Sequence, residues 1–135
     1  MKKDIPDLKV EDMAIAIAPR DPFIEEELWD SFIFNFKEEP IRNVLVVSKG
    51  YGEDEKGERR KTTTLRHFFD EIGPMAFQQI EPVAKDLFWL SHEYWVSFSY
   101  KGQIYDKKYV FVVGSLDTIH FTKIPFLDRK GVMIR

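Results

Sequence analysis

The clearest pattern in the chain is an alternation of side chains in the segment Leu87–Val113. From Tyr94 to Tyr100 every second residue is apolar or aromatic, which is the period of a strand with one buried face. Lys101-Gly102 supplies a two-residue turn, because glycine adopts the positive φ that tight hairpins need. The chain then returns through Ile104–Val113, which is rich in β-branched and aromatic residues. The predicted register pairs Tyr100 with Gln103, Phe98 with Tyr105 and Tyr94 with Tyr109.

A second alternating segment is Leu28–Lys37, which places Phe32, Phe34 and Phe36 on one face. After the break at Glu38-Glu39-Pro40, Ile41–Lys49 reads as another strand, so the two segments predict a second hairpin. Both faces of Val44–Val47 are apolar, which indicates a strand in the centre of a sheet.

Three further strands are expected, one near each end of the chain and one in its middle. Met13–Ala18 is a short apolar run that ends at Pro19, and Met75–Val83 has strand-like spacing that closes at Pro82. Val132–Ile134 adds a last short strand, whereas Pro125 excludes a central strand just before it.

Other segments leave their conformation open. In Thr62–Ile72 the apolar residues recur at helical spacing, which favours a short helix over a strand that begins with Thr62–Thr64. Arg20–Glu27 forms either one helical turn or a loop, and Leu116–Phe121 likewise forms a helical turn or a loop. Gly50–Lys61 is rich in glycine and charge and is expected to be an exposed loop, with Ser48–Gly52 as a glycine turn that leaves the strand.

Six or seven short strands with one or two short helices predict an all-β, mainly antiparallel fold, a two-layer immunoglobulin-like β-sandwich. The alternative is a sheet with one or two helices against a single face. Residues 1–12 are polar and predict an arm, and residues 13–135 predict a single domain. With 135 residues, of which 44% are hydrophobic, the chain is long enough to bury one core.

Composition narrows the classes of function. The formal net charge of −3 argues against a general binder of polyanions, which usually has a basic excess. The absence of cysteine excludes disulfides and thiolate chemistry. The segment after the first lysines is polar, unlike a secretory signal, and no run approaches the roughly 20 apolar residues of a membrane span. We therefore expect a soluble, cytoplasmic protein without a membrane partner.

The chain carries 3 histidines, His67, His92 and His120, and none lies at metal-ligand spacing from another. No metal site and no cofactor are predicted. His92-Glu93 could contribute half of an acid/base pair. Ser48–Gly52 matches neither a nucleophile elbow nor a phosphate-binding loop, so no catalytic residue is assigned.

Two features suggest contact surfaces. Arg59-Arg60-Lys61 could meet phosphates, but the acids at 53–55 and 58 dilute its field, which disfavours nucleic acid as a partner. The tryptophans and tyrosines exceed what one core face can absorb, and these residue types are enriched at protein interfaces. The predicted partner surface comprises Tyr51, Arg59, Arg60, Lys61, Trp89 and Trp95.

Several stretches are similar to a family of small bacterial proteins: LWDSFIFNFKEEPIRNVLVVSKGYG, TTTLRHFFDEIGP, EYWVSF, YDKKYVFV and the terminal IPFLDRKGVMIR. The resemblance covers most of the chain. Some members of that family are labelled as related to the phenylalanyl-tRNA synthetase α subunit. A class II synthetase holds ATP with an arginine-bearing motif 2 and a glycine-rich, arginine-ended motif 3, and neither motif is present here. The resemblance therefore implies no catalytic residue.

These observations lead to three hypotheses of function. The first is a non-enzymatic β-sandwich module that binds a protein, or a second copy of itself, through the aromatic hairpin face and the segment Gly50–Thr64. The second is a small hydrolase or ligand-binding enzyme whose site contains His67 or His92 and nearby acids. The third is an accessory RNA-binding protein related to translation, which would use the basic cluster at 59–61.

Overall fold

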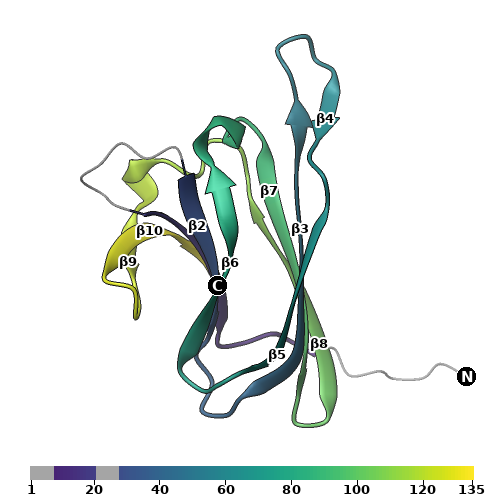
Figure 1. The fold of residues 1–135 in the computed structure, drawn as a ribbon, viewed down its shortest axis with the longest axis vertical. Helices are drawn as coiled ribbons and strands as arrows, with labels where there is room; N and C mark the ends of the chain where they lie inside the picture. Colours follow the sequence, from purple (N-terminus) through teal and green to yellow (C-terminus); the bar gives the residue numbers. More distant parts are fainter. Residues whose placement is uncertain (1–7, 21–27) are drawn as a thin grey trace, which may run out of the picture.

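Two antiparallel sheets face each other in the computed structural model, which describes residues 8–20 and 28–135 (Figure 1). The first sheet has the order β6-β2-β1-β10-β9, with β1 (Met13–Pro19), β2 (Leu28–Asn35), β6 (Ala76–Ala84), β9 (Thr122–Ile124) and β10 (Arg129–Ile134). The second has the order β4-β3-β7-β8, with β5 also paired to β3: β3 (Ile41–Glu53), β4 (Arg59–Lys61), β5 (Leu65–Ile72), β7 (Ser91–Tyr100) and β8 (Gln103–Phe111). Two short 3₁₀ turns, η1 (Lys85–Leu87) and η2 (Thr118–His120), complete the described elements. The predicted all-β sandwich is confirmed, and the alternative with helices against one sheet is not.

The predicted central hairpin is confirmed as β7 and β8. Its register pairs Tyr94 with Tyr109 and Phe98 with Tyr105, as the alternation required. The rings of Phe98 and Tyr105 stack with their centroids 5.4 Å apart. Both turn residues have positive φ, 50° at Lys101 and 76° at Gly102, which suits the right-handed twist of a tight hairpin.

The prediction of a second hairpin was wrong, because β2 and β3 belong to different sheets. β2 pairs with β1 and β6, whereas β3 lies between β7 and the strands β4 and β5. Asn35 holds the crossing between the sheets, since its side-chain amide donates to the carbonyl oxygens of Glu39 (3.0 Å), Ile72 (3.3 Å) and Gly73 (3.0 Å). The apolar run in β3 was correctly interpreted as a central strand.

The predicted helix over Thr62–Ile72 was also wrong. This stretch contains β5, which pairs with β3 from Ile41 opposite Ile72 to Ser48 opposite Leu65. Four apolar residues at helical spacing carried the helix prediction. The ladder to β3 instead satisfies the backbone of a strand whose side chains alternate between the sandwich interior and solvent.

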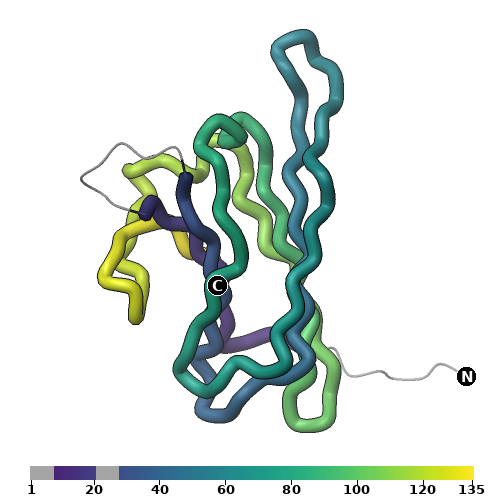
Figure 2. Tube along the Cα trace, viewed as in Figure 1, coloured from purple at the N-terminus to yellow at the C-terminus, as the bar shows by residue number. Residues whose placement is uncertain are grey.

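The predicted loop over Gly50–Lys61 is shorter than expected, and Ser48–Gly52 is part of β3 instead of a turn. β3 continues to Glu53 and pairs with β4, so that the two strands extend beyond the rest of the sandwich (Figure 2). Glycine at position 50 serves packing, because an added Cβ would lie 3.1 Å from Thr62 Cγ2 and 3.3 Å from Leu90 Cδ1.

The remaining predictions concern β6, the C-terminal strand, the segment Leu116–Phe121 and residues 1–12 and 20–27. β6 runs from Ala76 to Ala84, close to the predicted Met75–Val83, and it contains Pro82, which an edge strand tolerates because one side of its backbone has no strand partner. The last strand is confirmed as β10, and the Leu116–Phe121 segment contains the 3₁₀ turn η2. Residues 1–7 of the predicted arm and 21–27 of the predicted helical turn or loop lie outside the described residues.

Apolar side chains form two clusters. The larger one fills the space between the sheets, with residues such as Ile15, Ile33, Val46, Val96 and Phe98. The smaller one lies on the outer face of the first sheet and comprises Ala14, Ala16, Ala18, Phe32, Phe34 and Ile124. β1 and β2 therefore contribute side chains to both clusters, because successive side chains of a strand point to opposite faces.

Candidate functional site

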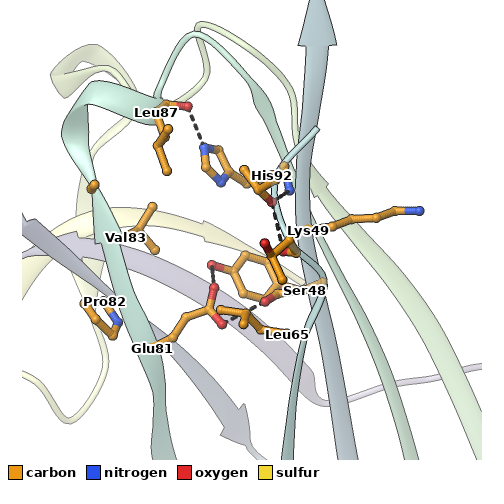
Figure 3. Close-up of a pocket in the computed structure, with 13 residues that line it drawn as sticks. Ser48, Lys49, Leu65, Glu81, Pro82, Val83, Leu87 and His92 are labelled. Atoms are coloured by element: carbon orange, nitrogen blue, oxygen red, sulfur yellow. Dashed lines mark hydrogen bonds between the residues drawn. The ribbon is translucent and has the colours of Figure 1, made fainter. Parts of the chain in front are cut away.

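A carboxylate on β6 links the two sheets at one side of the sandwich (Figure 3). Glu81 Oε1 accepts a hydrogen bond of 2.7 Å from the hydroxyl of Ser48 on β3 and lies 2.6 Å from Nε2 of His67 on β5. Its other oxygen, Oε2, is 3.5 Å from the hydroxyl of Tyr94 on β7. Four strands therefore contribute to one polar cluster, which we call the Glu81 cluster.

The Glu81 cluster borders a pocket of about 270 Å³. Pro82, Val83 and Leu87 form an apolar part of its wall, and Leu65 adds to it from β5. Ser48, Glu81, His92 and Tyr94 contribute polar side chains. An apolar pocket with a few converging polar groups is the usual form of a small-ligand site.

His92 is the second polar group of the pocket, and burial sets its charge. Its Nε2 lies 2.9 Å from the carbonyl oxygen of Leu87. Because a carbonyl can only accept, Nε2 carries the hydrogen, and Nδ1 of the neutral ring is an acceptor. Burial lowers the pKa of His92 below its usual value, although the Leu87 carbonyl and the charge of Glu81 act in the opposite direction.

Burial also fixes the protonation of Tyr94. The side chain is fully enclosed, which raises the pKa of its hydroxyl far above the usual value, and the charge of Glu81 raises it further. The hydroxyl consequently keeps its proton at neutral pH and donates it toward Glu81.

The geometry does not support a catalytic triad. In a triad the histidine lies between the hydroxyl and the carboxylate, so that the imidazole takes the proton of the nucleophile. Here the carboxylate of Glu81 lies between Ser48 and His67, and both contact the same oxygen. The two neighbours His92 and Glu93 point to opposite faces of β7, since His92 faces the pocket while Glu93 pairs with Lys49 at 3.7 Å.

The predicted partner surface is divided by the fold. Trp89 and Trp95 are exposed and Tyr51 is half-buried, as a contact surface requires. Arg60 is held by acids of its own hairpin, with Nε 2.8 Å from Asp54 and one terminal nitrogen 3.0 Å from Glu58. The basic cluster is therefore partly neutralised.

The other members of that surface, Arg59 and Lys61, are exposed on β4. Sequence reasoning missed Glu81 and the role of Ser48. The only signal was one acid within the largely uncharged segment Met75–Val83, and neither its orientation nor its partners were readable.

The outer face of the second sheet carries a group of apolar side chains that sequence reasoning had only partly identified. Phe68 and Trp95 are 59% and 42% exposed, and Leu45 and Val47 lie between them. We call these four residues the β5–β3–β7 face. Two adjacent rows cross it: Arg66, Val47, Trp95 and Lys108, then Phe68, Leu45, Ser97 and Asp106.

No protein-family model and no curated protein matches this chain. The resemblance to small bacterial proteins therefore stays a prediction. Within residues 8–20 and 28–135, no group of three or more histidines or acids is arranged to hold a metal ion. None of the helical segments in this part of the chain has the length and apolar character to cross a membrane.

Proposed function

We propose that this protein is a non-enzymatic β-sandwich module that self-associates through the β5–β3–β7 face. The observation that carries the proposal is the exposure of two large aromatic side chains, Phe68 and Trp95, on either side of Leu45 and Val47. Exposed apolar groups of this kind mark interaction sites, and aromatic residues dominate the binding energy of interfaces.

Charge complementarity favours a second copy of the same chain as the occupant. A two-fold axis that lies in the plane of the face and runs perpendicular to the strands exchanges the two rows. Lys108 of one copy then lies opposite Asp106 of the other, and Arg66 lies over Phe68. Both contacts are attractive, the first between opposite charges and the second between a cation and an aromatic ring. The face is thus complementary to itself.

The packing across this axis is also favourable in shape. Trp95 of one copy meets Ser97 of the other, so that a large side chain lies against a small one. Val47 meets Leu45, which buries two half-exposed aliphatic side chains. An antiparallel stack of sheets of this kind is the aligned packing that β-sandwiches already use internally.

Sedimentation equilibrium across the micromolar range tests the proposal. We expect wild type to shift from monomer to dimer as its concentration rises. Lys108→Asp places two acids opposite each other and is expected to weaken dimerisation about tenfold, whereas Asp106→Lys combined with Lys108→Asp restores the opposite charges and the affinity. Trp95→Ser is expected to abolish the dimer.

The matched control is Ile119→Ser, which removes an apolar side chain that is 79% exposed on η2, away from the face. It is expected to leave dimerisation unchanged. A wild-type protein that stays monomeric to about 100 µM contradicts the proposal, since the proposed face would then bind no second copy at the concentrations tested. An equal loss of affinity in Ile119→Ser, or a failure of the double charge exchange to restore it, would also reject it.

A further inference from the structure

The Glu81 pocket lies on the inner side of the second sheet and takes no part in the proposed dimer face. Four of the side chains that line it already donate hydrogen bonds within the protein. Ser48 donates to Glu81, Tyr94 is directed to the same carboxylate, and Nε2 of His92 donates to the Leu87 carbonyl. The Thr62 hydroxyl donates to the Thr63 carbonyl at 3.1 Å. A ligand that mainly accepts hydrogen bonds would find few donors here.

Acceptors remain. Within the described residues, Glu81 Oε2 has one contact, the 3.5 Å distance to the Tyr94 hydroxyl, although a carboxylate oxygen has two lone-pair sites. Nδ1 of His92 is another acceptor. Figure 3 shows the ring of His92 and the carboxylate of Glu81 directed into the same pocket, with Val83 on the same side of β6 as Glu81. The site therefore selects ligands that donate hydrogen bonds.

The carboxylate of Glu81, the acid in the lining of the pocket, disfavours anionic ligands. The side chain of Lys49 points away from the pocket (Figure 3), and its ammonium group lies 3.7 Å from the carboxylate of Glu93 on β7. A carboxylate that is largely shielded from water pairs strongly with a cation, because charge-assisted hydrogen bonds are about twice as strong as neutral ones.

Size limits the cation. A cavity of about 270 Å³ equals the volume of about nine water molecules at ~30 Å³ each, which is below the usual range for drug-sized ligands. The volume favours a short aliphatic stem, which would lie against Val83 and Leu87, over a nucleotide or a sugar chain.

We propose that the Glu81 pocket binds a small primary amine in its ammonium form. The ammonium group donates to Oε2 of Glu81, and the carbon stem lies along the apolar wall. Ser48 and His67 hold Oε1, so they act as positioning residues that leave Oε2 directed to the ligand. This inference is independent of the proposed dimer, because the two sites lie on opposite faces of the second sheet.

Titration of ¹⁵N-labelled protein with n-butylammonium chloride at low salt, followed by amide chemical shifts, tests the proposal. We expect saturable shifts confined to residues 48–50, 62–65, 81–84 and 92–94. n-Butanol, which has the same length but no charge, is expected to bind at least about tenfold more weakly. Glu81→Gln is expected to lose about the same factor.

Glu71→Gln is the matched control, since Glu71 lies on β5 with its side chain 51% exposed and pairs with Arg42. It is expected to bind butylammonium as wild type does, and so is the dimer variant Lys108→Asp. If Glu81→Gln unfolds, Leu65→Trp serves instead, because Leu65 is exposed and lines the pocket, and a larger side chain there obstructs it. Absence of saturable shifts in wild type, equal binding of butanol, or unchanged binding in a folded Glu81→Gln or Leu65→Trp would overturn the proposal.

Discussion

Both outer faces of the sandwich carry aromatic side chains, but the chain covers those on the first sheet and leaves those on the second sheet exposed. On the first sheet, Phe32 and Phe34 are buried, because the chain folds back over them at Ile124–Leu127. On the second sheet, Phe68 and Trp95 remain exposed. An aromatic side chain on an outward-facing strand position is therefore part of the core in one sheet and part of the surface in the other.

Small residues explain how the first face is covered. Ala14, Ala16 and Ala18 leave room above β1, and Gly131 lets β10 approach the backbone of Ile17 and Ala18. Aromatic rings then close the layer, with Phe34 and Phe77 centroids 5.7 Å apart and Phe77 and Phe126 6.5 Å apart. The covered face contributes to the stability of the monomer, whereas the open face is available to a partner.

The largest expected effect comes from exchanging one aromatic residue on each face for alanine. Phe34→Ala is expected to lower the free energy of unfolding by about 3–5 kcal/mol, because it leaves a cavity in a closed apolar layer. Phe68→Ala is expected to change it by about 0.5 kcal/mol or less. Urea denaturation of dilute, monomeric protein measures both. Similar values for the two variants would show that the faces do not differ as described.

A smaller effect is expected at the strand contact that brings the cover close. A Cβ on Gly131 would lie 2.5 Å from the carbonyl oxygen of Ile17 and 2.7 Å from the Cβ of Ala18. Gly131→Ala is therefore expected to lower the free energy of unfolding by about 1–3 kcal/mol through overpacking.

Gly73→Ala is the control for that prediction. Among residues 8–20 and 28–135, no atom apart from those of its two chain neighbours lies within 4 Å of a Cβ built at Gly73, and its φ lies outside the positive range. The substitution is expected to stabilise the protein by about 0.4–1 kcal/mol, because alanine restricts the unfolded chain. Thermal unfolding measures the stability of both variants. A Gly131→Ala variant as stable as wild type would contradict the close approach of β10 and β1.

The smallest effect concerns pH and the inner side of the second sheet. Burial lowers the pKa of His92 in the folded state below its usual 6.5, so the unfolded chain binds more protons as the pH falls through that value. Folding free energy is therefore lost on acidification, between the unfolded pKa and the lower folded one. His92→Gln is expected to lose less stability than wild type between about pH 7.5 and pH 5.5. Urea titrations at each pH measure this difference, and parallel profiles would count against a buried, neutral imidazole.

Much of the fold was predictable because a period of two is local. The alternation in Tyr94–Tyr100 and in the strand that follows predicted the hairpin, its turn and its register. The apolar run Val44–Val47 predicted a central strand. The candidate site was predictable only in part. His67 and His92 were named with unspecified acids, and Trp95 was placed on a contact surface, but Glu81 and Phe68 were not singled out.

The sequence by itself determined the strands that alternate with a period of two, such as β7, β8 and the central part of β3, and which of their side chains share a face, because that period depends on neighbours two residues apart. Only the tertiary structure decided that β2 and β3 part into different sheets, that Thr62–Ile72 contains the strand β5, and that Glu81 meets Ser48, His67 and Tyr94. It also decided which outer face the chain covers. These outcomes depend on pairings between residues far apart in the chain, whose free energy no local pattern contains.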